Sequence, residues 1–139
     1  MTKLTSTNPA DYKILGEAEI TSEAEIVEKV KKANNAKKAW KTIGLGERIK
    51  LLRKAVDKLG EKKEELAQLA TKEMGMPISQ SKADVNDAIS YFTWYLDNAP
   101  KYLSPEVVFE DDKTTHTVYY EPLGTAAVIT PWNFPLSNF

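Results

Sequence analysis

The residues best suited to chemistry lie near the end of the chain, where Trp132, Asn133 and Phe134 stand between Pro131 and Pro135. Because proline has a fixed φ angle and no amide donor, the two prolines restrict the turn and present Asn133 on a stiff support. An asparagine amide offers two donors without a charge, which suits it to stabilise an oxyanion that appears only in a transition state. Trp132 and Phe134 could line a cofactor site or an apolar substrate channel.

A structural interpretation of the same residues stays open beside the chemical one. Asn133 could simply cap a turn, because asparagine and proline are common turn formers. Trp132 and Phe134 would then be ordinary core residues. Composition alone favours neither interpretation.

The residues before this turn predict a buried strand. Residues 125–130 are small or β-branched, carry no charge and do not alternate in polarity, which is typical of a strand covered on both faces of a parallel sheet. Pro131 would end this strand. In open α/β sheets the ligand lies outside the carboxyl ends of the strands, so the turn after residue 130 is the predicted binding site.

Two motifs in this region resemble a known family. They are Glu121-Pro122-Leu123-Gly124 and Val128-Ile129-Thr130-Pro131-Trp132-Asn133-Phe134-Pro135-Leu136. Together they are similar to the strand-and-turn signature of the NAD(P)-dependent aldehyde dehydrogenase superfamily. The resemblance implies that Asn133 donates to the oxyanion of the thiohemiacetal formed on the catalytic cysteine. It also implies that Phe134 faces the aldehyde channel and that the nicotinamide-ribose side of the cofactor site is lined by Ile129, Thr130, Pro131 and Trp132.

Further upstream, Arg48 and the turn Glu73-Met74-Gly75-Met76-Pro77 also resemble this family, with Met76 where a lysine is common. The tract from Leu66 to Met76 suggests the branch that oxidises semialdehydes such as succinate semialdehyde. The implied fold class is α/β and aldehyde dehydrogenase-like, here a fragment with about four N-terminal helices, a β-hairpin and the first strand of the cofactor-binding sheet. The implied domains are a helical part of the cofactor-binding domain (1–105), a hairpin of the oligomerisation sheet (106–121), and an incomplete cofactor-domain strand with its turn (122–139).

The sequence contains no cysteine. An aldehyde dehydrogenase needs a thiolate nucleophile, a nicotinamide hydride acceptor and a glutamate that assists hydrolysis of the thioester. In the family the cysteine and this glutamate lie downstream of the Pro-Trp-Asn turn. We therefore expect the 139 residues to be inactive alone and to work with NAD or NADP, an aldehyde, and the rest of the enzyme or a complementary chain.

Composition excludes several other classes of protein. The formal net charge is −1, which gives no field for steering nucleic acid. No apolar run follows the N-terminus, so we expect a cytoplasmic protein without a membrane segment. Adjacent Asp111 and Asp112 suggest a solvated turn, and the single histidine, His116, has no partner at ligand spacing, so no metal site is predicted.

Local patterns predict the helices. Ser22 and Glu25 have the form of a capping box that starts a helix reaching about Trp40. A second helix should end at Gly60 as its C-cap, a third should run from residue 61 to about 74 and stop at Gly75, and a fourth should run from 77 to about 98 before Pro100 breaks it. The predicted buried residues of the last two helices are Leu66, Leu69, Ala70, Val85, Ala88, Ile89, Phe92, Tyr95 and Leu96.

Two further segments of the chain predict strands. A short strand should follow the Asn8-Pro9 turn, and residues 107–110 and 115–121 should form a hairpin whose free edges favour self-association. One alternative function is a stand-alone helical interaction module that pairs with a separate catalytic chain. Another is a nucleic-acid binder using the lysine-rich first helix, which the near-neutral charge argues against.

Overall fold

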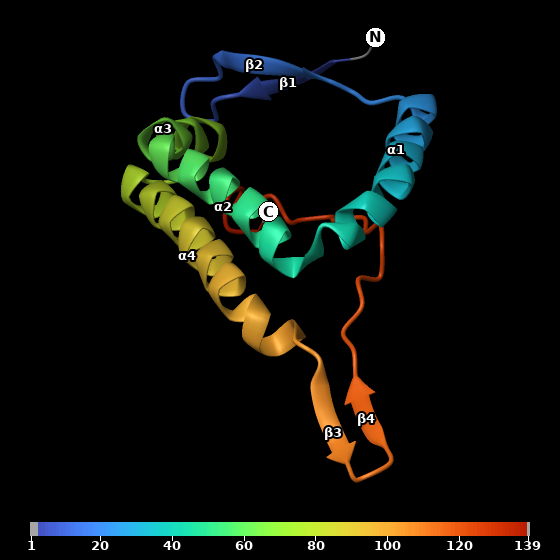
Figure 1. Cartoon of the computed structure of the whole chain (residues 1–139). Coiled ribbons are helices and arrows are strands. Elements are labelled where there is room, and N and C mark those ends of the chain that lie inside the picture. Colours follow the sequence, from blue (N-terminus) through green and yellow to red (C-terminus); the bar gives the residue numbers. More distant parts are fainter. Residues whose placement is uncertain (1–2, 139) are drawn as a thin grey trace.

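The computed structural model describes residues 3–138. Four helices lie between two separate pairs of antiparallel strands (Figure 1). The elements are β1 (Lys3–Thr7), β2 (Ile14–Glu19), α1 (Glu23–Thr42), α2 (Gly44–Glu61), α3 (Lys63–Met74), α4 (Ile78–Leu103), β3 (Glu106–Glu110) and β4 (Thr115–Val118). Within residues 3–138, no helix is both long and apolar enough to span a bilayer.

The core lies where α4 packs against α2 and α3. Its buried apolar residues are Ala67, Ala70, Val85, Ala88 and Leu96. Four of these were predicted, and Ala67 is an addition that brings α3 close to α4, because an alanine side chain keeps the two backbones near one another. The predictions for Leu69 and Tyr95 were wrong, since their side chains are 45% and 67% exposed.

Helix α1 begins at the capping box that the sequence predicts. The Ser22 hydroxyl accepts from the Glu25 backbone N–H at 3.3 Å, while the Glu25 carboxylate accepts from the Ser22 backbone N–H at 2.8 Å. These reciprocal bonds satisfy two donors that a helix start leaves unpaired. Every residue of α1 is exposed, so local interactions must account for much of its stability.

The capping box predicts a pH dependence of α1. The backbone and hydroxyl hydrogen bonds from Ser22 lower the pKa of Glu25 below its ordinary 4.5. Because the folded pKa is the lower one, this stabilisation is present above the unfolded pKa and is lost as the pH falls through the folded value. We expect the ¹³Cα shifts of α1 to lose helical character below pH 4.5.

Two variants test this pH dependence. Glu25→Gln, which keeps the capping geometry without the titration, should remove most of it. Glu28→Gln, on the same helix but outside the box, should leave it unchanged. An identical pH profile for Glu25→Gln and the unmodified chain would contradict the capping role.

Two predicted helix ends differ from the structure. Helix α2 continues past Gly60 to Glu61 with Lys62 as its C-cap, whereas Gly75 ends α3 with φ of 70°, as predicted. Pro100 lies inside α4, which ends only at Leu103. Pro100 is in the last turn, so the hydrogen bond that its missing N–H removes lies near a helix end whose backbone carbonyls already lack intrahelical donors. The Ser104 hydroxyl donates to the Pro100 carbonyl.

The first strand pair contains one strand that the sequence did not reveal. β2 is the predicted strand, and β1 pairs with it antiparallel across the turn at Asn8 and Pro9. β1 was missed because four of the five residues of Lys3–Thr7 are polar, so the strand lacks an apolar alternation. The pair contacts the end of α3, where the Ser6 hydroxyl donates to Glu73 at 2.6 Å.

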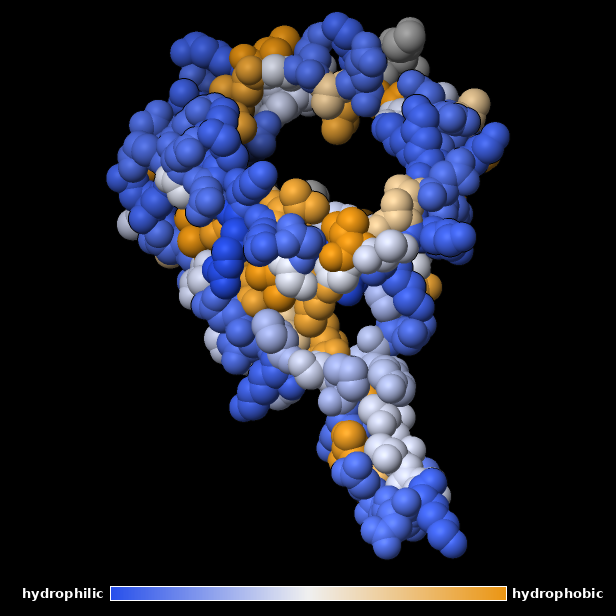
Figure 2. All heavy atoms as spheres, in the orientation of Figure 1, coloured by the Kyte–Doolittle hydropathy of each residue, from blue (hydrophilic) through white to orange (hydrophobic). Residues whose placement is uncertain are grey.

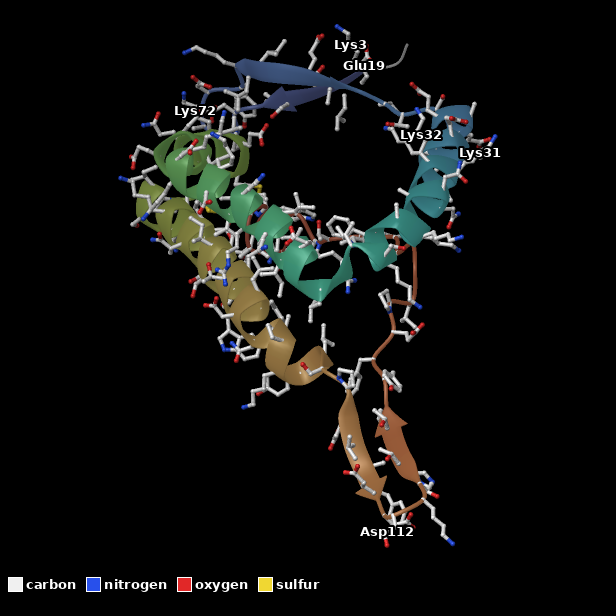
Figure 3. The ribbon with its side chains drawn as sticks, viewed as in Figure 1. Lys3, Glu19, Lys31, Lys32, Lys72 and Asp112 are labelled. Atoms are coloured by element: carbon white, nitrogen blue, oxygen red, sulfur yellow. The ribbon has the colours of Figure 1, made fainter. Side chains whose placement is uncertain are left out.

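The β3–β4 hairpin confirms the second strand prediction, although β4 ends at Val118 rather than residue 121. Its turn is built on Asp111, whose Oδ1 accepts from the backbone N–H of Lys113 and Thr114 at 2.8 Å each. Figure 3 places Asp112 at the tip of this hairpin, away from the helices, and Lys31 and Lys32 on α1. The hairpin extends from the helices as an arm (Figure 1).

The prediction of a strand at residues 125–130 was wrong for this structure. These residues form no strand and are exposed, with Ile129 at 95%. A parallel strand forms only against neighbouring strands, and residues 3–138 place none beside it. Instead the segment after β4 returns to α1 (Figure 1), where Glu121 pairs with Lys41 and Thr125 donates to Asn34 at 3.0 Å. Its end is bonded to Asp84 of α4.

Candidate functional site

The predicted site turn begins irregularly and ends in a single helical turn. Residues 131–134 have no regular structure, and the backbone N–H of Asn138 then donates to the Phe134 carbonyl at 3.2 Å. Pro135 and Leu136 are half-buried, whereas Pro131, Trp132 and Asn133 are exposed. The turn is therefore fixed at its C-terminal side and open where the chemistry is expected.

Asn133 presents its amide to solvent. Its Oδ1 accepts a long hydrogen bond from Asn138 Nδ2, at 3.5 Å. Among residues 3–138, no hydrogen bond occupies its Nδ2 group. An amide engaged at its carbonyl and free at its nitrogen keeps two donors for a ligand oxygen. Asn138 was not recognised from the sequence, because nothing local distinguishes it from a surface residue.

Asp84 on α4 holds the C-terminal side of this turn. Its carboxylate is buried, with 2% of the residue exposed, and accepts from the backbone N–H of Leu136 at 3.1 Å and of Ser137 at 2.9 Å. Asp84 was not predicted from the sequence. The helical spacing could have indicated it, since Asp84 shares the buried face of the helix with Ser81, Val85 and Ala88. A polar residue on a buried face needs hydrogen-bond partners.

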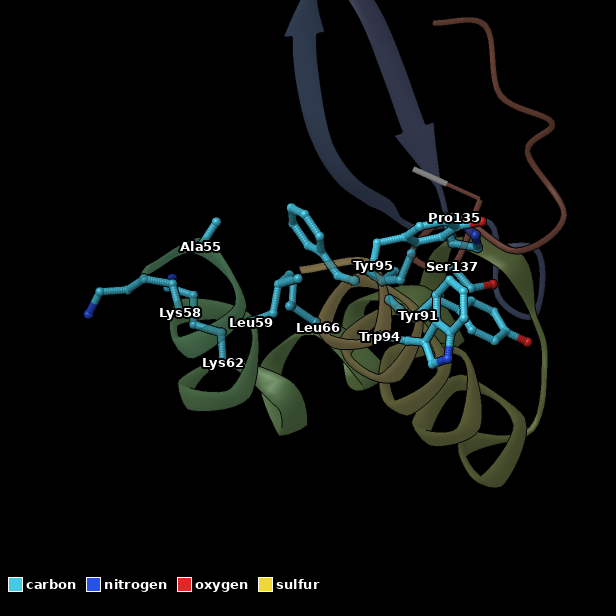
Figure 4. A pocket seen from close by; sticks show the side chains of 13 residues that line it. Ala55, Lys58, Leu59, Lys62, Leu66, Tyr91, Trp94, Tyr95, Pro135 and Ser137 are labelled. Carbon is cyan, nitrogen blue, oxygen red and sulfur yellow. The ribbon is translucent and has the colours of Figure 1, made fainter. Parts of the chain in front are cut away.

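An apolar groove lies beside the anchored turn. It has a volume of about 1030 Å³ and is lined by Leu59 of α2, Leu66 of α3, Phe92 and Trp94 of α4, and Pro135 and Leu136. In Figure 4, Pro135 and Ser137 lie at the same side of the groove as Tyr91 and Trp94. Figure 2 shows apolar side chains gathered over the helices beneath the opening framed by the N-terminal strands and α1. Such a surface is typical of a contact with another polypeptide.

The other predicted site residues are not assembled into a pocket. Trp132 is 78% exposed and Phe134 is 48% exposed, so the structure brings neither against a partner wall. Ile129, Thr130 and Pro131 lie on the irregular exposed segment before them. The segment 129–132 presents apolar faces, one hydroxyl and backbone carbonyls outside any strand ladder.

The described residues contain no group of three or more His, Asp or Glu side chains that could hold a metal. His116 lies against Phe109 in the hairpin, with ring centroids 5.2 Å apart. Asp111 accepts backbone hydrogen bonds within its turn. These contacts account for both residues structurally.

The sequence of this chain is similar to those of known proteins. The model of the aldehyde dehydrogenase family matches residues 1–139. The chain is 30% identical over 129 residues to a glutarate-semialdehyde dehydrogenase of Pseudomonas putida, covering 93% of this chain and 27% of that protein. It has the same identity and coverage with the Escherichia coli succinate-semialdehyde dehydrogenase [NADP(+)] GabD.

Solved structures show the same fold. The aldehyde dehydrogenase of Brucella melitensis biovar abortus superposes with a TM-score of 0.90 at 30% identity, over 98% of this chain and 28% of that one. The chain thus spans about 27% of the length of these curated relatives. The four helices and two strand pairs are the elements that match.

Proposed function

Because the chain belongs to the aldehyde dehydrogenase family, we propose that it forms the N-terminal part of an NAD(P)-dependent enzyme that oxidises an aldehyde to a carboxylate. The single observation that carries this proposal is the amide of Asn133, whose Nδ2 group bonds to no other residue among 3–138 and which lies on a turn that Asp84 anchors. The names of the relatives support a semialdehyde as substrate and NADP as one possible cofactor.

Asn133 stabilises the developing oxyanion in this proposal. When a thiolate adds to an aldehyde, the carbonyl oxygen becomes an alkoxide, which needs a hydrogen-bond donor that carries no competing negative charge. The Nδ2 group of Asn133 is such a donor. The thiol comes from outside these residues, since the chain has no cysteine, and residues 1–139 alone are therefore inactive.

Ile129, Thr130, Pro131 and Trp132 line the nicotinamide-ribose side of the cofactor site, and Phe134 lines the aldehyde channel. NAD(P), when bound, supplies the hydride acceptor. The Thr130 hydroxyl and the free backbone carbonyls offer partners for ribose hydroxyls, while the exposed Trp132 ring offers an apolar face. Once the rest of the enzyme completes the channel, Phe134 restricts water next to Asn133, which strengthens the hydrogen bond to the oxyanion.

The proposal divides the chain into a helical part of the cofactor-binding domain (1–105), an assembly hairpin (106–121), and a cofactor-domain strand with its turn (122–139). The exposed apolar residues Val107, Val108 and Phe109 on β3 support self-association through the hairpin. Residues 125–130 become a strand once the neighbouring strands of a complete sheet are present, which agrees with their β-branched composition.

A hybrid enzyme tests the proposed function. In it, residues 1–139 replace the segment of E. coli GabD that they match, and succinate-semialdehyde oxidation is followed by NADPH absorbance. We expect a folded hybrid with activity, and no activity from residues 1–139 alone. Thermal unfolding and assembly state, compared with GabD, show whether the hybrid is folded. A folded hybrid without activity would overturn the proposal.

In the interaction-module alternative, a separate catalytic chain covers the apolar groove beside the site turn. Mixing residues 1–139 with the separately made remainder of GabD distinguishes a chain that assembles after synthesis from one that must be covalently continuous. Activity recovered on mixing would favour the module, because association alone would then complete the site.

A further inference from the structure

We propose that Asp84 is a positioning residue for Asn133, and this inference rests on the proposed oxyanion role of Asn133. Asp84 would not touch the substrate. It would act through the backbone of the turn that carries the oxyanion donor.

The first step is the burial of the carboxylate. Asp84 is 2% exposed, and a buried charge is costly unless its oxygens are satisfied. Each oxygen has a backbone partner, with Leu136 N at 3.1 Å from Oδ2 and Ser137 N at 2.9 Å from Oδ1. Within residues 3–138, Asp84 forms no salt bridge. Two backbone N–H groups therefore compensate this charge. A change in the turn that removed them would leave a buried carboxylate without hydrogen-bond partners.

The second step is the identity of the two donors. Leu136 and Ser137 lie in the turn closed by the bond from Asn138 N to Phe134 O, where backbone N–H groups at the start have no partner of their own. A carboxylate that accepts from both fixes the position and the direction of the turn through charge-assisted bonds. Asp84 provides this carboxylate from helix α4, 52 residues before Leu136 in the chain.

The third step connects the turn to Asn133. Asn133 lies three residues before Leu136, and its side-chain carbonyl receives the bond from Asn138, the residue after Ser137. The anchored pair of residues therefore lies between the two asparagines. If Leu136 and Ser137 move, the Asn133–Asn138 contact and the direction of the Asn133 donors change together. Helix α4, itself packed in the core, thus orients the amide.

The surroundings of Asp84 support a dedicated role. Its neighbours on the helix face are Ser81, which hydrogen bonds Thr71 of α3 at 2.8 Å, and the fully buried Val85. The Ser81 hydroxyl and the Val85 side chain are thus engaged within the α3–α4 packing, whereas the Asp84 carboxylate accepts from the backbone of the site turn. Among the described residues, no buried side-chain nitrogen or oxygen lacks a partner. The carboxylate is thus fully used by the turn.

The first experiment measures amide hydrogen exchange in the 139-residue chain by NMR. Asp84→Asn replaces one acceptor oxygen with an NH₂ group, so we expect exchange at Leu136 and Ser137 to accelerate about tenfold or more, while amides of α2 change little. Asp87→Asn is the matched control, because Asp87 is exposed on the same helix and should leave both amides unchanged. Unchanged exchange in Asp84→Asn would overturn the proposal.

The second experiment uses the GabD hybrid and a double-mutant cycle. Asp84→Asn should lower kcat about tenfold with KM values within about twofold, and Asp84→Glu should restore part of the loss. In the Asn133→Ala background, Asp84→Asn should have no further effect on kcat, because the donor it positions is gone. A loss of the same size in both backgrounds would show a merely structural role and overturn the proposal.

The two experiments separate this inference from the proposed function. If Asn133→Ala leaves kcat unchanged, the oxyanion role fails, and the positioning of a catalytic donor fails with it. Faster exchange at Leu136 and Ser137 in that case would retain Asp84 as an anchor of the turn only. If Asn133→Ala abolishes activity but Asp84→Asn changes neither exchange nor kcat, the positioning role alone is overturned.

Discussion

Replacing Asn133 with alanine in the GabD hybrid should lower kcat about 100- to 1,000-fold, the usual cost of removing one oxyanion donor. The KM for the aldehyde should change much less, because the donor acts on a charge that the bound aldehyde does not yet carry. Steady-state kinetics at saturating cofactor would separate these two effects. The free Nδ2 group of Asn133 is the structural reason for this expectation.

Two further variants distinguish hydrogen-bond donation from side-chain shape. Asn133→Asp has nearly the same shape but a negative charge in place of the donors, so its kcat should be at least as low as that of Asn133→Ala. Asn86→Ala, an exposed asparagine on α4, is the matched control and should retain full activity. An Asn133→Asp hybrid that kept most of its kcat would contradict an oxyanion role.

Local sequence signals predicted local structure in this chain. The Ser22–Glu25 box and the stop at Gly75 were correct because each depends on interactions among residues close in sequence. The fourth helix was predicted too short, since Pro100 was expected to end it and instead lies in its last turn. Gly60 was expected to end the second helix, but a glycine without a positive φ does not require a helix end.

Interactions between distant segments were not visible in the sequence. Residues 125–130 have strand composition but lack neighbouring strands, and composition cannot show whether such partners are present. The residues of the site turn were identified by family resemblance, whereas the carboxylate that holds this turn was not. Asp84 is joined to Ser137 by a bond that spans 53 positions, and its only local sign is its place on an apolar helix face.

The second large effect should come from Gly75, where α3 ends and the N-terminal strand pair makes contact. Gly75 has φ of +70°, and a Cβ built there would lie 2.9 Å from Pro9 Cγ. An alanine would meet both a left-handed backbone and a ring that cannot rotate away. We expect Gly75→Ala to lower the free energy of unfolding by about 2 kcal/mol or more, measured by urea denaturation of the chain.

Gly60 provides the matched control, because it lies inside α2 with no atom within 4 Å of a built Cβ. Gly60→Ala should raise the free energy of unfolding by about 0.5–1 kcal/mol, since alanine is the better helix former and restricts the unfolded chain. Opposite signs at the two glycines would show that backbone conformation and close contact decide the outcome. A Gly75→Ala chain as stable as the unmodified one would contradict this account.

The cost at Gly75 has two separable parts. In a Pro9→Gly background the ring is absent, so Gly75→Ala should there cost only the left-handed backbone term, about 1–2 kcal/mol. The difference between the two backgrounds measures the close contact between the Asn8-Pro9 turn and the end of α3. Amide exchange shows whether this contact docks the strand pair on α3. Gly75→Ala should accelerate exchange of the β1–β2 amides relative to the unmodified chain. Adding Gly75→Ala to Pro9→Gly should not accelerate it relative to Pro9→Gly alone.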